Sequence, residues 1–341
     1  MARGGRLRGR WSTAAAIGLS AAWLYQRRSE AADLVRYPVP GRLVDVGGRR
    51  LHVEDHGGTG TPIMIETGAG TLACDWQPIL DRMRQVGHVF SYERAGIGWS
   101  DGGPWRPDPT RTVEDLHRLL GVLGAEGTRG PWILVGHSLG GLFARQFAAR
   151  YPTEVAALVL VDPSHEEQLR RARATFGRKA LALQVTMAAV YLGYPRFVAR
   201  VVLGLGGIRL ARKLVGGETD DEVRRNASLY LRSGFRRSYF AEMAAVPALA
   251  RSLLSEPPRP GALPVAVVTA APPQDAANLM ARFRDDWLKM HESIASADRS
   301  IHLVADKGGH FVYKDDPDVV VQALEWAVTA RGGVAPDTGN G

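Results

Sequence analysis

The chain has 341 residues, of which 45% are hydrophobic and 23% charged, values that exclude a disordered, collagen-like or disulfide-rich protein. The formal net charge is +8, but the first 29 positions alone carry six arginines and no acidic residue. Because this charge excess is confined to one end of the chain, it does not predict a nucleic-acid-binding surface.

The N-terminal segment, residues 1–37, contains an apolar stretch at residues 11–25 with arginines on both sides. As a helix the stretch would be about 22 Å long, shorter than the roughly 30 Å hydrocarbon core of a bilayer. Long arginine side chains can reach the membrane interface. We expect a signal-anchor or membrane-surface helix. Because arginines lie on both sides of it, the sequence does not decide its orientation in the membrane. A cleaved signal peptide, which would leave a secreted protein, and a segment without a targeting role stay open.

Residues 38–162 show a strand-rich pattern followed by alternating strands and helices. The run at 155–161 is almost continuously apolar, as expected for a parallel strand buried on both faces. The predicted strands are residues 43–46, 51–54, 62–66, 88–93, 132–136 and 155–161, and the predicted helices are residues 76–86, 112–123 and 139–150.

A helix-rich, basic insertion at residues 163–260 interrupts this alternation. We interpret it as a cap or lid over the site, although additional structural helices would give the same pattern. Alternation resumes in residues 261–330, before a flexible tail at 331–341. The pattern predicts an α/β fold: a mostly parallel eight-stranded sheet, helices on both faces and a helical cap after the sixth strand.

The sequence Gly-His-Ser-Leu-Gly occupies residues 136–140, between a predicted strand and a predicted helix. In that context G-x-S-x-G is typical of a nucleophile elbow, a sharp turn that presents a serine hydroxyl at a helix N-terminus. The pattern therefore predicts Ser138 as a nucleophile.

Two further motifs accompany the elbow. Residues 92–100, Tyr-Glu-Arg-Ala-Gly-Ile-Gly-Trp-Ser, resemble a D-R-x-G-x-G-x-S turn with Glu93 in the aspartate position, and residues 308–311 read Gly-Gly-His-Phe. With the elbow, they resemble the α/β-hydrolase fold superfamily from about residue 40 to residue 328. The resemblance implies a serine hydrolase, similar to esterases and lipases, with its nucleophile, acid and histidine in that chain order.

Chain order selects the base. His310 lies on a glycine-flanked loop after the last predicted strand, whereas His291 lies in a helix and His302 in a strand. We expect His310 to act as the general base.

The acid has two candidates. Asp162 directly follows the strand at 155–161, and Asp275 lies on a proline-containing loop after the next strand. Since the carboxylate must hold the imidazole rigidly, we favour Asp162 and keep Asp275 as the alternative.

The oxyanion hole requires backbone N–H groups beside the nucleophile. We expect them from Leu139 and from Ala69 or Gly70, where Thr67-Gly68 replaces the His-Gly common in the superfamily. His137 and Trp99 are candidates for the substrate pocket. No H-E-x-x-H or C-x-x-C pattern occurs, so we expect neither a metal site nor a cofactor. The lone Cys74 is interpreted as a buried core residue.

The residues predict hydrolysis of an ester-like bond in an apolar small molecule or lipid, through an acyl-enzyme intermediate. Thioester, lactone and amide substrates stay open because the fold does not choose among them. A serine nucleophile argues against epoxide hydrolase or dehalogenase chemistry, which uses a carboxylate at this position. The alternative is a non-catalytic ligand-binding or membrane-associated protein on a retained hydrolase fold.

Overall fold

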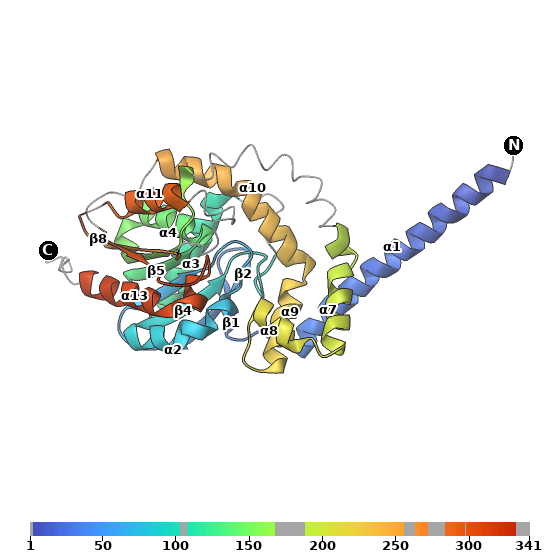
Figure 1. Ribbon diagram of the computed structural model, residues 1–341, viewed down its shortest axis with the longest axis horizontal. Helices are drawn as coiled ribbons and strands as arrows, with labels where there is room; N and C mark the ends of the chain where they lie inside the picture. The colour runs from blue at the N-terminus through green and yellow to red at the C-terminus, as the bar shows by residue number, and fades with distance from the viewer. Residues whose placement is uncertain are drawn as a thin grey trace. The chain divides into compact units, whose positions relative to one another are not determined.

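The computed structural model describes residues 3–102, 108–167, 188–255, 263–271, 284–296 and 298–331 (Figure 1). The chain forms two compact units. The helical unit comprises Met1–Pro40 and Thr175–Arg237, and the sheet unit comprises Gly41–Ala174 and Ser238–Gly341.

The described part of the sheet unit contains an eight-stranded sheet with the order β1-β2-β4-β3-β5-β6-β7-β8. The pairs β1–β2 and β2–β4 are antiparallel, and the other neighbouring strands are parallel. This arrangement confirms the predicted fold class. The strands are β1 (Arg42–Asp45), β2 (Arg50–Gly57), β3 (Pro62–Glu66), β4 (His88–Glu93), β5 (Trp132–His137), β6 (Val155–Val161), β7 (Val265–Thr269) and β8 (Ser300–Val304).

Helices cover both faces of this sheet. Alternate strand residues point to opposite sides, and here both sets are apolar and need to be buried. In β6, Leu158 and Leu160 pack in one core cluster with α3, α4 and α10, whereas Val159 and Val161 pack in another with α2 and α13. The helices of the unit are η1 (Ala73–Trp76), α2 (Gln77–Val86), α3 (Pro109–Ala125), α4 (Leu139–Arg150), η2 (Pro152–Glu154), the later part of α10 (Ser233–Ser255), α11 (Arg284–Ile294), α12 (Val312–Asp315) and α13 (Pro317–Arg331).

The register of β5 and β6 brings the ends of two strands together. His137 pairs with Val161, so the next residues, Ser138 and Asp162, leave neighbouring parallel strands at the same edge of the sheet. In open α/β sheets, this carboxyl edge is where ligands bind.

The helical unit contains α1 (Arg3–Arg36), α7 (Tyr194–Gly204), α8 (Ile208–Val215), α9 (Asp220–Tyr230) and the first residues of α10. Residues 1–37, predicted as a separate segment, belong to the same compact unit as residues 175–237. Buried Gln26 accounts for part of this grouping, since it donates to the Leu231 carbonyl (2.8 Å) and accepts from the Arg196 guanidinium (3.1 Å). Within the residues described, no helix combines the length and apolar character needed to cross a membrane.

Candidate active site

Ser138 occupies a strained turn between β5 and α4. Its backbone has φ 53° and ψ −120°, the left-handed side of the map that a non-glycine residue rarely adopts. The chain is packed tightly enough here to require glycine two positions after Ser138, because a Cβ on Gly140 would lie 2.2 Å from the Glu66 carbonyl oxygen. The sequence thus forms the expected elbow.

Two loops bring an imidazole and a carboxylate to this serine. His310 Nε2 lies 2.9 Å from Ser138 Oγ, and His310 Nδ1 lies 2.6 Å from Asp162 Oδ2. If Nδ1 carries the proton and donates a hydrogen bond to the carboxylate, Nε2 is free to accept a hydrogen bond from the serine hydroxyl. The structure therefore brings together the predicted nucleophile, the predicted base and the favoured acid. The alternative acid, Asp275, lies outside the described residues.

The Asp162 carboxylate is fixed from several sides. Its backbone has φ 41°, and its other oxygen, Oδ1, accepts from the Ala270 N–H and the Trp287 indole N–H, each at 3.0 Å. Burial is the largest single influence and opposes ionisation of Asp162, but the hydrogen bonds from His310 and Ala270 and the nearby histidine charges together outweigh it, so the pKa of the carboxyl is lowered. A rigid, ionised carboxylate results. No pattern in the sequence indicated the hydrogen bond from Trp287.

His137 lies beneath the loop that carries His310. Its Nε2 donates to the His310 carbonyl (2.8 Å), and its ring packs edge-on against Tyr313. Burial, then the neighbouring His310 charge, lowers the pKa of His137 to about 3. His137 was expected in the substrate pocket, but its ring is only 1% exposed. Its ring N–H instead positions the backbone of His310.

Trp99, the other expected pocket residue, is also buried. It lies in the turn after β4, where its backbone N–H donates to the Glu93 carboxylate (2.6 Å). That carboxylate also bonds His52 Nδ1 (3.1 Å). The structure thus places Trp99 in the packing of the turn.

The loop after β3 lies directly beside the nucleophile. A Cβ on Gly68 would lie 2.7 Å from His137 Nδ1 and 3.3 Å from Ser138 Cβ, so this position has no room for a side chain. Ala69 and Gly70, the candidate oxyanion donors, follow in the same loop. Leu139 begins α4, and an N–H in the first turn of a helix has no intrahelical acceptor.

Arg94 holds this loop in place through hydrogen bonds to its backbone carbonyl groups. Its guanidinium donates to the Thr67 carbonyl (2.6 Å) and the Gly68 carbonyl (3.1 Å). It also donates to the carboxylates of Glu66 and Glu242, the latter through Nε (2.6 Å) and Nη2 (3.0 Å). Burial alone would lower the pKa of Arg94, but Glu242 and then Glu66 raise it, so the group stays charged.

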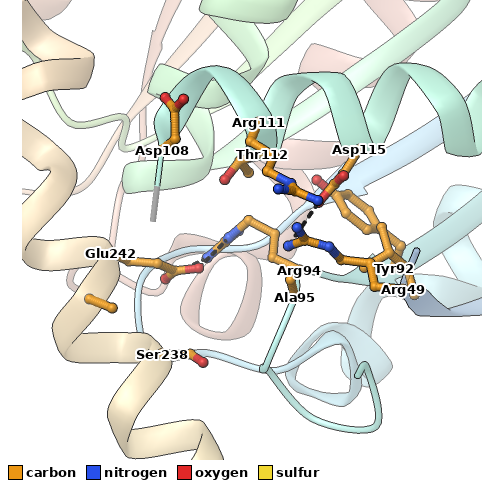
Figure 2. Close-up of a pocket in the computed structure, with 12 residues that line it drawn as sticks. Arg49, Tyr92, Arg94, Ala95, Asp108, Arg111, Thr112, Asp115, Ser238 and Glu242 are labelled. Atoms are coloured by element: carbon orange, nitrogen blue, oxygen red, sulfur yellow. Dashed lines mark hydrogen bonds and ion pairs between the residues drawn. The ribbon is translucent and has the colours of Figure 1, made fainter. Parts of the chain in front are cut away.

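Figure 2 shows Arg94 and Glu242 paired with each other in the lining of a pocket. The empty volume of this pocket is about 480 Å³, including open solvent. Ser138 and His310 are not among the residues that line it, so we do not assign the chemistry to this pocket. The sequence motif contained Arg94, but nothing in the sequence linked it to Glu242, 148 residues away.

Helix α10 also contacts this loop directly, through Tyr239. The Tyr239 ring lies against Gly70, since a Cβ on that glycine would be 2.9 Å from Tyr239 Cδ2. Sequence reasoning missed this aromatic, which is placed above a loop adjoining Ser138.

Comparison with known families agrees with the fold. Residues 56–323 match the family model described as "Alpha/beta hydrolase family". The chain therefore belongs to the α/β hydrolase family.

Individual relatives are distant. The "Putative carbamate hydrolase RutD" of Variovorax paradoxus (strain S110) is 37% identical over 134 residues, which cover 38% of this chain and 49% of that protein. The uncharacterized protein YbdG of Bacillus subtilis (strain 168) is 23% identical over 301 residues, 87% of each chain. The chain thus spans about half of the first relative, so that protein's activity does not transfer directly.

Solved structures support the fold alone. The deformylase Nfo from Pseudomonas putida S16 has a TM-score of 0.53 at 19% identity, covering 83% of this chain and 99% of that chain. A structure from a study of carboxylesterases of Nitrososphaera gargenis has a TM-score of 0.56 at 15% identity, covering 86% and 100%.

Proposed function

We propose that the protein is a serine hydrolase that cleaves an ester-like bond of an apolar small molecule or lipid through an acyl-enzyme. One observation carries this proposal: the continuous hydrogen-bonded line from Ser138 Oγ through the His310 ring to Asp162. Such a line supplies a nucleophile, its base and the group that orients the base.

The reaction has two halves. His310 Nε2 takes the Ser138 proton while Oγ attacks the substrate carbonyl, and ionised Asp162 stabilises the imidazolium that forms. The N–H groups of Leu139 and Ala69 bind the oxyanion. The imidazolium then protonates the leaving group, which departs and leaves an acyl group on the serine. In the second half, His310 activates a water that releases the acid.

The relatives do not determine which type of carbonyl bond is cleaved. Relatives and neighbours named as a carbamate hydrolase, a deformylase and carboxylesterases span amide-like and ester bonds. Carbonyl substrates of each kind suit a serine that forms an acyl intermediate. We favour esters because an alkoxide or phenolate leaves more readily than an amine.

A screen of p-nitrophenyl esters of graded acyl length tests the proposal. The wild type should show turnover, and Ser138→Ala should reduce kcat by roughly 10³-fold or more, because only binding and the oxyanion hole remain.

The acid is tested in the same screen. Asp162→Asn should reduce kcat by about 10³- to 10⁴-fold, since the imidazole loses its orientation and its counter-charge. Asp275→Asn serves as the matched control and should retain activity. Full activity in Asp162→Asn together with loss in Asp275→Asn would reverse the assignment of the acid. Absence of turnover across all acyl lengths would favour a non-catalytic ligand-binding protein.

A further inference from the structure

The two units carry opposite net charge. The helical unit contains 19 Lys and Arg against 6 Asp and Glu, a net charge of +13, whereas the sheet unit contains 24 against 29, a net charge of −5. The excess of +8 in the whole chain is therefore the difference between a strongly basic unit and an acidic one. A unit of this kind attracts anionic surfaces.

Part of the basic unit is also unusually apolar at its surface. The hairpin of α7 and α8 exposes seven large apolar side chains, with Leu205 83% and Leu214 70% exposed. In α7 they recur every three or four residues and so form one helix face. The seven are Tyr194, Phe197, Val198, Val201, Leu205, Leu210 and Leu214.

The opposite face of α7 is the one that packs inside the unit. Arg196 on that face is 3% exposed and pairs with Asp33 of α1, and it also donates to Gln26 (3.1 Å). The hairpin is thus anchored by its inner face, and its apolar outer face does not belong to the core of the unit.

Basic side chains accompany the apolar ones along this stretch of sequence. Residues 188–217 contain five Lys and Arg and no Asp or Glu. Two of the five are ion-paired with acids from outside this range, Arg196 with Asp33 and Arg212 with Asp220. In α8, exposed Arg209 and Lys213 are adjacent in sequence to exposed Leu210 and Leu214. Long basic side chains beside apolar ones suit a membrane interface, where the apolar groups enter the acyl region and the cations remain among the head groups.

We propose that the exposed face of α7–α8 docks on an anionic phospholipid surface. This goes beyond a role for the N-terminal segment alone and does not depend on the hydrolase chemistry. A nucleic acid would use the positive charge but leave seven apolar side chains in water. A second copy would bury the apolar side chains but would bring two +13 units together. A lipid surface with anionic head groups satisfies both features.

Co-sedimentation of the full chain with vesicles tests this. The wild type should bind vesicles of phosphatidylcholine with phosphatidylglycerol much more strongly than vesicles of phosphatidylcholine alone. The double variant Leu210→Ser, Leu214→Ser should weaken partitioning about tenfold or more, because it removes two inserted side chains. The double variant Arg209→Glu, Lys213→Glu should weaken it by about tenfold or more on anionic vesicles.

Matched controls lie in the sheet unit. Leu254→Ser alters an exposed leucine of α10, and the double variant Arg251→Glu, Lys289→Glu makes the same charge change at exposed positions. Both should bind like the wild type, and circular dichroism should show all variants folded. Unchanged binding in the α7–α8 variants would overturn the proposal. The proposal would also be overturned if the protein bound a DNA duplex but not vesicles. The same holds if these variants lost a dimer while vesicle binding stayed unchanged.

Discussion

Ser138 and Asp162 are the two non-glycine residues with positive φ among those that the structure describes. Each directly follows a parallel strand, β5 or β6, and each belongs to the proposed triad. Strained backbone of this kind persists only where the surroundings enforce it, and it concentrates at functional sites. The Asp162 N–H donates to the Val268 carbonyl at 2.7 Å, which shows one such constraint.

The sequence could locate these residues and favoured Asp162 as the acid, with Asp275 as the alternative. Chain order and the loop position pointed to His310, and the strand end pointed to Asp162. The contacts that fix the Asp162 carboxylate, from Ala270 and Trp287, join positions 108 and 125 residues apart, which no local pattern reveals. The buried role of His137 was missed for the same reason, since its partner carbonyl is 173 residues away.

His137 gives a prediction about stability and pH. Its pKa is about 3 in the folded protein against 6.5 for an ordinary histidine, so the unfolded chain takes up the proton first as pH falls. The contribution of this residue is therefore complete above about pH 6.5 and is lost progressively down to about pH 3. Between pH 7.5 and 5.0 this loss is about 2 kcal/mol of unfolding free energy.

The variant His137→Gln tests this, because the glutamine amide can still reach the His310 carbonyl but does not titrate. Urea unfolding at pH 7.5 and 5.0 should show a smaller drop in stability for the variant than for the wild type. Other buried histidines, such as His56 and His291, are present in both proteins and cancel in the comparison. An equal drop in both would contradict the buried neutral state of His137.

Helix α10 and the turn after β4 both contact residues 67–70, the loop proposed to supply an oxyanion donor. Glu242 of α10 forms a two-point ion pair with Arg94, which in turn bonds the carbonyls of Thr67 and Gly68. A fork of this shape orients two peptide groups at once, which a lysine cannot do. We infer that Arg94 is a positioning residue that aims the N–H groups of this loop at the reacting carbonyl.

Arg94→Lys should therefore lower kcat about 10- to 100-fold with a smaller effect on KM, because a misplaced oxyanion donor acts mainly on the transition state. Glu242→Gln should produce a weaker effect in the same direction. Steady-state kinetics on the best p-nitrophenyl ester measures both.

Arg145→Lys is the matched control. Arg145 pairs in two-point fashion with Glu166 (2.6 and 2.9 Å) and is similarly buried, but this ion pair lies outside the loop of residues 67–70. It should lose stability without a selective loss of kcat. Equal changes of kcat in Arg94→Lys and Arg145→Lys would reduce the proposed positioning to a general effect on folding.

Across the whole molecule, the sheet followed from the sequence more readily than the grouping of the helices. Period-two and apolar runs identified the strands because a buried sheet imposes those patterns locally. Residues 1–37 showed only an apolar stretch flanked by arginines, and their association with residues 175–237 depends on contacts such as Gln26 to Leu231, 205 residues apart. The charge of +13 was divided between the same two segments, so neither segment alone indicated its full size.

The central claim is that Ser138 is a nucleophile activated by His310. Incubation of the folded protein with a fluorophosphonate probe, followed by peptide mass spectrometry, tests it most directly. The account predicts a single phosphonylated site at Ser138, slow labelling in His310→Ala and none in Ser138→Ala. Absence of labelling in the folded wild type, or labelling that persists in Ser138→Ala, would contradict it.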